Sequence, residues 1–403
     1  MWKHCRAMQA ELVEMRRALH QIPELGTQLP ETEAYVIARL EEYGIPYRKN
    51  SADSGIVAVI EGGRPGKTLA LRADMDGLRI TEETGKPYAS RREGCMHACG
   101  HDCHTAMLLG AAKVLNDGRE KLQGRVVLLF QSGEENFQGA RQMLQNQALD
   151  GVDGIFGTHI GCIIDKDIPS GSFVIAPGPV MAAVDRFCIR VRGVGCHGST
   201  PEKGVDPVNI AAHILISLQT INSREFNACV PVVLTVGRIQ GGSQYNVLPD
   251  EVILEGTVRT LEETVRERTL RRIREIAEAT AAAFGGTALT ELERGAPPVV
   301  NDEAMAALAA DAVQEFLEPE KIITRLAQPN MGGEDFSLLL EKVPGAFLFL
   351  SSSDHQLGTD IPHHNPKFDV DESVLWQGSA AFVAIAQRFL NGSSANLSES
   401  GKN

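Results

Sequence analysis

Residues 125–130 read Arg-Val-Val-Leu-Leu-Phe, and this run decides the fold class. A continuous apolar run of this length is typical of a strand that is buried on both faces of a sheet. Apolar residues recur at helical spacing over 106–115 before it and over 140–147 after it, and another short apolar run follows at 154–157. Strands that alternate with helices in this way predict an α/β sheet covered by helices.

The same alternation extends toward the N-terminus. The pattern predicts two helices within 7–43, separated by a segment that contains Pro and Gly, and two strands at 56–60 and 68–72. The Gly- and Pro-rich segment 61–67 lies between these strands and indicates a hairpin turn.

The middle of the chain has a different character and predicts a second domain. Its pattern indicates strands and helices in the order 185–192, 207–221, 232–240, 251–259 and 262–284. The helix 303–316, the strand 346–350 and the helix 373–390 that follow would complete the first sheet. We therefore predict a discontinuous catalytic domain, 1–180 plus 295–392, with a smaller α+β domain, 181–294, inserted into it. The polar tail 393–403 is expected to be disordered.

Length and composition limit the classes of protein that need to be considered. The 403 residues fit two or three domains, and 43% hydrophobic with 23% charged residues is a globular balance. The formal net charge of −13 argues against a nucleic-acid partner. The N-terminus has no apolar signal core, and no apolar stretch is long enough to span a membrane, so we expect a soluble, cytoplasmic protein.

The densest group of reactive side chains lies in the segment 96–105, Met-His-Ala-Cys-Gly-His-Asp-Cys-His-Thr. Cys99 and His101 are expected in a loop just ahead of the 106–115 helix, where free amides and the helix dipole favour a thiolate. This pair suits a metal ion, and Asp102 is expected to hold a ligating imidazole. An iron–sulfur cluster is the weaker alternative, because the cysteine spacing differs from that of ferredoxins.

Further candidates lie at the ends of predicted strands, where α/β sheets bind their ligands. These positions carry Asp74 and Asp76, Glu134 and Glu135, and His159. Of two adjacent acids, one could bind a metal and the other could serve as general base toward a water molecule. His363 and His364 form another candidate pair, and the residues alone leave open which of the two would act.

Two glycine-rich stretches resemble phosphate-binding loops but do not meet the requirements of one. The stretch 62–68 is one residue too short for a Walker A loop and leads into a strand. The stretch 193–198 matches Gly-x-Gly-x-x-Gly, but the next helix begins only near residue 207, which argues against a nicotinamide oxidoreductase. His197 in this stretch could instead reach toward a substrate. A binding protein without catalysis is a third class, and the intact set of metal-type residues argues against it.

Taken in order, the motifs resemble those of the M20 metallopeptidase family. Within it they are similar to the amidohydrolase branch of plant auxin-conjugate hydrolases, hippurate hydrolases and bacterial N-acyl-amino-acid amidohydrolases. The resemblance covers nearly the whole chain and rests on the motifs at 17–25, 71–78, 96–102, 133–135, 198–201, 246–249, 332–336 and 364–366.

The resemblance implies a zinc-peptidase-like α/β catalytic domain with an inserted lid domain that forms a homodimer. It also implies two divalent metal ions per subunit, with Glu134 as general base. Mixed thiolate, imidazole and carboxylate ligands admit Mn, Zn, Co or Ni. The implied ligands are Cys99, His101, Glu135, His159 and His364. His364 is preferred to His363 because the family's histidine lies two residues before the proline. In relatives, the residues at the positions of His197, Asn246 and Arg259 meet the substrate.

The function that the resemblance implies is that of a metal-dependent, aminoacylase- or carboxypeptidase-like amidohydrolase. Its reaction would split an N-acyl amino acid into a carboxylic acid and a free amino acid. A dipeptidase or exopeptidase, or an N-acetyl-diaminopimelate deacetylase, would use the same site and is the alternative. The expected partner is a small-molecule substrate, not a nucleic acid or a membrane.

Overall fold

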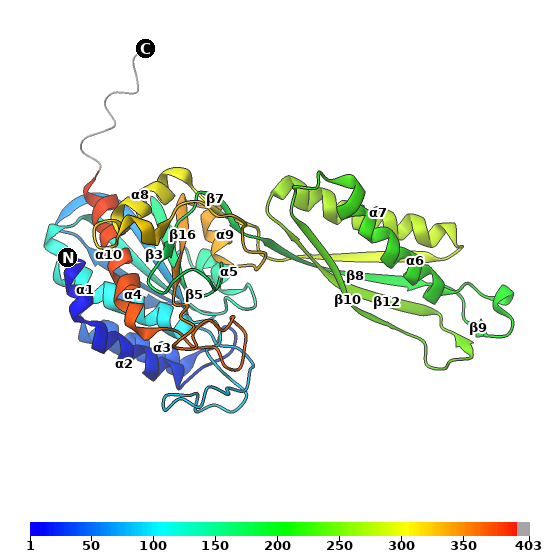
Figure 1. Ribbon diagram of the computed structural model, residues 1–403, viewed down its shortest axis with the longest axis horizontal. Helices are drawn as coiled ribbons and strands as arrows, with labels where there is room; N and C mark the ends of the chain where they lie inside the picture. Colours follow the sequence, from blue (N-terminus) through cyan, green and yellow to red (C-terminus); the bar gives the residue numbers. More distant parts are fainter. Residues whose placement is uncertain (393–403) are drawn as a thin grey trace, which may run out of the picture. The chain divides into compact units, whose positions relative to one another are not determined.

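The computed structural model describes residues 1–392, which form two compact units (Figure 1). Among the described residues, unit 1 comprises Met1–Val180, Val300–Gln328 and 335–392, and unit 2 comprises Met181–Val299 with Pro329–Glu334. The predicted inserted range 181–294 falls within unit 2. The chain crosses between the units within β7 (Gly178–Met181) and β14 (Val299–Asn301), and again at each end of Pro329–Glu334. The predicted disordered tail, 393–403, lies outside the described residues.

Unit 1 contains an eight-stranded mixed sheet, which confirms the predicted α/β class. Its strand order is β1-β2-β4-β3-β5-β16-β6-β15. The strands are β1 (Tyr47–Lys49), β2 (Ile56–Glu61), β3 (Arg64–Asp74), β4 (Gln123–Gln131), β5 (Gly154–Gly161), β6 (Phe173–Val174), β15 (Ile322–Ile323) and β16 (Gly345–Ser351). The central strands β4, β3, β5 and β16 run parallel to one another, so their carboxyl ends meet at one edge of the sheet.

The predicted hairpin between the strands at 56–60 and 68–72 is wrong. Strand β4 lies between β2 and β3, pairing antiparallel with β2 and parallel with β3. The physical reason is burial: the apolar run that forms β4 is enclosed from Val126 to Gln131, and only a central place in the sheet covers both of its faces. The segment 61–67 therefore connects two strands that are not neighbours.

Helices cover both faces of the sheet, with α2, α4 and α10 on one side and α5 and α9 on the other (Figure 1). The helices of unit 1 are α1 (Lys3–Ala7), α2 (Gln9–His20), α3 (Pro30–Glu42), α4 (His101–Asp117), α5 (Gly139–Gln145), α8 (Glu303–Val313), α9 (Phe336–Leu340) and α10 (Leu375–Asn391). Helices α4 and α10 lie almost wholly within the core. Their close approach requires Gly378, because a Cβ atom there would lie 2.0 Å from Met107 Sδ.

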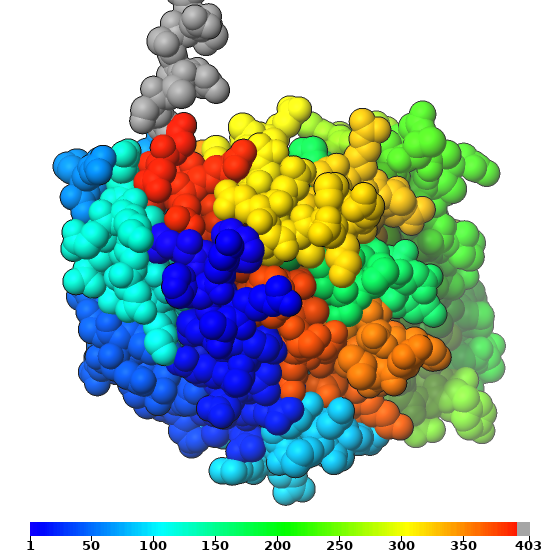
Figure 2. Space-filling model, turned by 60° about the vertical axis from the view of Figure 1, so that its left-hand side comes forward, coloured from blue at the N-terminus to red at the C-terminus, as the bar shows by residue number. Residues whose placement is uncertain are grey.

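The N-terminal and C-terminal parts of unit 1 lie side by side. Figure 2 shows the first helices, in dark blue, against the C-terminal segments, in orange and red. The Gln9 side chain donates to the Glu372 carbonyl at 2.6 Å and accepts from the Trp376 amide at 3.0 Å. Both ends of the chain therefore contribute to the helical layer that supports the sheet.

Unit 2 is a four-stranded antiparallel sheet with two helices packed on one of its faces. The sheet order is β10-β12-β8-β13, with β8 (Ala183–Arg192), β10 (Val232–Gly241), β12 (Glu251–Thr260) and β13 (Thr287–Arg294). The helices are α6 (Pro207–Thr220) and α7 (Glu263–Ala283), and a small ribbon joins β9 (Cys196–His197) to β11 (Val247–Leu248). Helix α6 begins where the Asp206 carboxylate accepts from the amides of Val208 and Asn209, as an N-cap requires.

None of the helices formed by residues 1–392 is long and apolar enough to cross a membrane.

Candidate metal centre

The five predicted metal ligands all belong to unit 1 and converge at the carboxyl edge of its sheet. Cys99, His101 and His159 each place one donor atom within 4.8 Å of the others. Cys99, Glu135 and His364 form a second group on the same criterion, so the Cys99 thiol belongs to both. These side chains come from segments that are far apart in the sequence, and the parallel strands bring them together.

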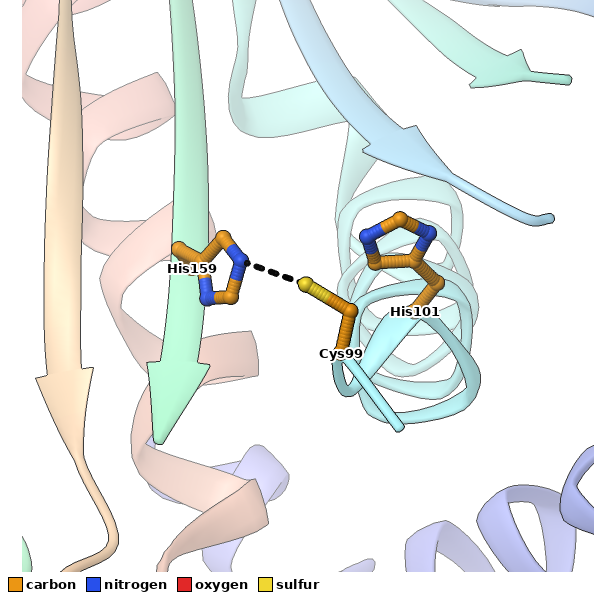
Figure 3. Close-up of side chains that lie close together, drawn as sticks. All are labelled: Cys99, His101 and His159. Atoms are coloured by element: carbon orange, nitrogen blue, oxygen red, sulfur yellow. Dashed lines mark hydrogen bonds between the residues drawn. The ribbon is translucent and has the colours of Figure 1, made fainter. Parts of the chain in front are cut away.

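The elements that present these side chains differ in part from the sequence prediction. His159 lies inside β5 and not beyond its end, because β5 continues to Gly161 in pairing with β16. His101 is the first residue of α4 and not part of a preceding loop, and Cys99 stands just before the left-handed N-cap residue Gly100. Figure 3 shows His159 extending from its strand toward the Cys99 sulfur, with His159 Nε2 and Cys99 Sγ 3.5 Å apart.

Hydrogen bonds to carbonyl groups orient two of the imidazoles. His101 Nδ1 donates to the Asp76 carbonyl at 2.8 Å, and His159 Nδ1 donates to the Ile160 carbonyl at 2.9 Å. A carbonyl oxygen only accepts, so in each neutral ring Nδ1 carries the proton and Nε2 keeps its lone pair. Both rings therefore present Nε2 as the ligand atom.

A buried polar atom without a partner tests whether these residues suit a metal ion. His101 Nε2 is buried and has no hydrogen-bond partner among residues 1–392. Its separation from Asp74 Oδ2 is 3.6 Å, which is too long for a hydrogen bond. A metal ion would satisfy this lone pair, and a thiolate, imidazoles and a carboxylate together are a donor set that divalent transition metals bind. The residues present therefore fit a metal centre.

The charges of the clustered side chains also favour a metal ion. Glu135 Oε1 lies 3.3 Å from His364 Nε2, and Cys99 with Glu135 raises the pKa of His364 to about 10. Burial, aided by the Glu135 charge, raises the pKa of the Cys99 thiol. Burial alone would raise the pKa of Glu135, but His364 lowers it below its usual value. The His364 imidazolium balances the negative charge of Glu135, so a cation is favoured at this position.

Asp76 organises the turn that carries the two adjacent glutamates. Its carboxylate accepts from the Glu134 amide at 3.0 Å and from the Glu135 amide at 3.1 Å. The Asp335 amide approaches Glu134 Oε1 at 3.3 Å. Glu134 is buried, and one of its carboxylate oxygens lies within 4.8 Å of a donor atom of His101 and of Glu135. The sequence placed Asp76 after a strand but did not reveal that its side chain holds this turn.

The expectation that Asp102 holds a ligating imidazole is wrong. Asp102 Oδ2 accepts from Arg16 Nε at 2.8 Å and from His20 Nδ1 at 2.7 Å, and all three side chains are buried. Consecutive helical residues point about 100° apart, so Asp102 turns from His101 toward α2. Asp102 instead anchors the first turn of α4, and the carbonyl of Asp76 orients His101.

A buried polar chain that sequence reasoning missed lies behind the cluster. Arg72 pairs with Asp74 at 2.7 Å and with Asp335 at 2.8 Å. Asp74 Oδ1 accepts from His104 Nδ1 at 2.5 Å, and His104 Nε2 accepts from the Ile160 amide at 2.9 Å. The position of Asp74 at a strand end was the only sequence signal for this chain.

The two neighbouring histidines have different surroundings. His364 faces Glu135 and adopts a left-handed backbone with φ of 61°, whereas His363 is turned inward and its Nε2 donates to the Ile160 carbonyl at 3.0 Å. None of the possible ligand groups formed by the described residues includes His363.

The three predicted substrate-binding residues belong to unit 2. His197 pairs with Val247 in the β9–β11 ribbon, and the Gly198 amide donates to the Asn246 carbonyl at 2.8 Å, so His197 and Asn246 are neighbours. His197 Nδ1 lies 2.8 Å from Ser199 Oγ, and the side chain is exposed. Arg259 is half-buried on β12, opposite Val184 of β8, and burial lowers the pKa of its guanidinium.

Comparison with known proteins finds relatives that match nearly the whole chain. The sequence profile of "Peptidase family M20/M25/M40" matches residues 70–388. An N-acetyl-L-cysteine deacetylase of Bacillus subtilis (strain 168) is 41% identical over 386 residues, which cover 95% of this chain and 89% of that protein. Thermostable carboxypeptidase 1 of Saccharolobus solfataricus is 35% identical over 384 residues, 94% of this chain and 95% of that protein.

A solved structure extends the similarity to the fold. The crystal structure of a Bacillus subtilis protein, described as a dinuclear metal-binding peptidase from the M20 family, superposes with a TM-score of 0.83. The two chains are 36% identical, and the match covers 96% of this chain and 99% of that one.

Proposed function

The chain belongs to peptidase family M20/M25/M40, and from that premise we propose that it hydrolyses the amide bond of N-acyl amino acids, giving a carboxylic acid and a free amino acid. The deacetylase named above acts, by its name, on an N-acetyl amino acid, and it shares 41% of its aligned residues with this chain. The observation that carries the proposal is the convergence of a thiol, imidazoles and two adjacent carboxylates at one edge of the sheet.

The proposed ligands of two divalent metal ions are Cys99, His101, Glu135, His159 and His364. The orphaned His101 Nε2 and the shared position of Cys99 in two donor groups support this assignment. The similarity to a dinuclear peptidase supports the number of ions. Thiolate, imidazole and carboxylate donors admit Mn, Zn, Co or Ni.

Two divalent ions at this site would polarise the scissile carbonyl and lower the pKa of water. We assign Glu134 as the general base and acid. Its carboxylate takes a proton from the attacking water and returns it to the leaving nitrogen, so that one water molecule is consumed for each amide bond broken. The Asp76 carboxylate holds the Glu134 amide at 3.0 Å and so fixes the backbone from which this side chain extends.

Three residues of unit 2 are proposed to bind substrate. His197, with its exposed ring, would donate to the oxyanion that develops on the acyl group. Asn246 is its neighbour in the same ribbon. The half-buried Arg259 guanidinium, whose charged form burial disfavours and the Asp185 carboxylate favours, is proposed to receive the substrate carboxylate.

We further place the enzyme in the cytoplasm as a homodimer formed through unit 2. All eight cysteines are free thiols, as is typical of a reducing compartment. Strand β10 is an edge strand of its sheet with Val233 and Ile239 exposed, and helix α6 exposes Val208 and Ile216. An unpaired edge next to exposed apolar side chains favours association with another chain. The homodimer is tested by size-exclusion chromatography with light scattering, which measures the molar mass of the assembly.

The test of the proposed function is hydrolysis by metal-stripped protein resupplied separately with Mn, Zn, Co and Ni. Substrates are N-acetyl-cysteine, N-acetyl-methionine and hippurate, with a dipeptide and N-acetyl-diaminopimelate as the alternatives. We expect cleavage of the acylated amino acids only after a metal is restored. Cleavage of the dipeptide alone would favour the peptidase alternative, which the similarity to a carboxypeptidase supports.

A variant separates catalysis from metal binding. Glu134→Gln is expected to lower kcat by at least about 100-fold while leaving the bound metal content unchanged. The same substitution at the exposed Glu120 is the matched control and is expected to leave both values unchanged. Turnover by Glu134→Gln close to that of the unmodified protein would contradict the assignment.

A further inference from the structure

The backbone N–H and C=O of one residue, Ile160 on β5, contact three histidines. Its N–H donates to His104 Nε2 at 2.9 Å. Its carbonyl accepts from His159 Nδ1 at 2.9 Å and from His363 Nε2 at 3.0 Å. The carbonyl oxygen has two lone pairs, so these two imidazoles satisfy it completely.

The His363 ring is half-buried and packs against two other rings. It lies against the ring of Phe368 with centroids 4.7 Å apart and edge-on to the ring of His159 at 5.0 Å. Gly161 makes room for it, because a Cβ atom at that position would lie 2.2 Å from His363 Nε2. The backbone at Gly161, with φ of 128°, is one that residues with a Cβ rarely adopt. His363 and Gly161 are therefore a matched pair.

His363 connects the segments that carry the proposed ligands. Its side chain binds β5 directly beside His159, and the next residue along the chain is His364. The His364 amide in turn donates to the Ala98 carbonyl at 2.8 Å, one residue before Cys99. Three ligand-bearing segments are thus joined through two hydrogen bonds made by consecutive residues.

From this arrangement we propose that His363 is a positioning residue for the metal centre, whose Nε2–H bond to the Ile160 carbonyl orients His159 and holds His364 in place. The inference rests on the proposed function, because it takes His159 and His364 as ligands. His363 itself is not proposed as a ligand, because it belongs to none of the possible ligand groups formed by the described residues. Loss of such supporting hydrogen bonds typically weakens metal binding about 10–100-fold.

The experiment measures Co²⁺ binding to the metal-free protein by competition with a chelator, together with the visible absorption of the bound Co²⁺. His363→Phe keeps a ring of similar size but removes the donor. His363→Gln places an amide N–H near the position of Nε2 and restores it. Phe368→Leu is the matched control, because it reduces packing around His363 and leaves the hydrogen bond in place. Urea unfolding of each metal-free variant shows that it is folded, and His363→Met replaces His363→Phe if the latter is not.

We expect His363→Phe to weaken Co²⁺ binding about 10–100-fold and to alter the Co²⁺ absorption bands. His363→Gln and Phe368→Leu are expected to stay within threefold of the unmodified protein. Unchanged affinity and absorption in His363→Phe would overturn the inference, as would an equal loss in His363→Gln or in Phe368→Leu. Failure of the unmodified protein to bind Co²⁺ at all would instead refute the proposed metal centre.

Discussion

Replacing Asp102 by Asn tests whether the first turn of α4 depends on a buried network of charges. Asp102 Oδ2 receives hydrogen bonds from Arg16 and His20, while Oδ1 has no partner among the described residues. The Asn side chain keeps one oxygen for the two donors but places an NH₂ group where Oδ1 now lies. It also removes the charge that opposes the fully buried guanidinium of Arg16.

The magnitude follows from the burial of the charges. Arg16 keeps Asp369 at 3.0 Å and Glu372 at 3.1 Å but loses Asp102, whose side chain is also fully buried. Breaking a buried ion pair by removing one partner costs about 3–5 kcal/mol. We expect Asp102→Asn to lower the free energy of unfolding of unit 1 by that amount at neutral pH.

The pH dependence of this loss has a defined sign. Burial alone would raise the pKa of Asp102, but Arg16 and His20 lower it well below its usual value. The stability that Asp102 contributes is therefore present above its unfolded pKa of about 3.9 and is lost as the pH falls. Burial and Arg16 disfavour the charged form of His20, but Asp102 raises its pKa overall, so its contribution is lost as the pH rises through that raised value. The difference between the two proteins should be largest near about pH 5 and shrink below about pH 4.

Urea unfolding of the metal-free proteins, followed by tryptophan fluorescence, provides the measurement. Both tryptophans of the chain, Trp2 and Trp376, belong to unit 1, so the signal reports that unit. Asp311→Asn is the matched control, because its ion pair with Arg388 is exposed and is worth at most about 1 kcal/mol. A loss in Asp102→Asn no larger than that of the control would refute the reasoning.

Three further predictions concern the site, unit 2 and the metal. Asp76→Ala leaves the amides of Glu134 and Glu135 without their acceptor, and we expect kcat to fall about 10–100-fold in protein whose urea unfolding transition shows that it is folded; an unchanged kcat would contradict this. Arg266→Met leaves the buried Asp185 carboxylate without the guanidinium that it contacts at 2.6 Å. We expect the free energy of unfolding of unit 2 to fall by about 3–5 kcal/mol. The measurement is the rate of proteolysis within 181–299, which should rise, and an unchanged rate would contradict the prediction. Removing a metal that had been present at 1,000 times its Kd should lower the free energy of unfolding of unit 1 by about 4 kcal/mol. Tryptophan fluorescence measures the unfolding midpoint with and without a chelator. A midpoint that the chelator does not shift would show that unit 1 holds no such ion.

The chemistry of the site could be predicted largely from local sequence. A thiol and an imidazole separated by one residue, and two adjacent acids after an apolar run, are patterns whose residue types already indicate metal binding and proton transfer. The residues named from these patterns include Cys99, His101, Glu134 and Glu135, and the structure brings them together. The α/β class followed from the apolar run of β4, since a strand buried on both faces belongs in the centre of a sheet.

Which segments pack against one another could be learned only from the tertiary structure. The segments of β2 and β3 look like a hairpin in the sequence, yet β4 inserts between them because its burial demands two neighbouring strands. Asp102 stands next to His101 in the chain, but the rotation of about 100° per helical residue sends it to Arg16, 86 positions away.

His363 and His364 also show what local sequence determines and what depends on the tertiary structure. The sequence by itself determined which residue types were available, because composition and short-range spacing encode burial and reactivity. Only the tertiary structure decided that His363 bonds to Ile160, 203 positions away, while His364 faces Glu135. Side-chain direction depends on backbone angles and on the packing of distant segments, and neither is contained in the identity of neighbouring residues.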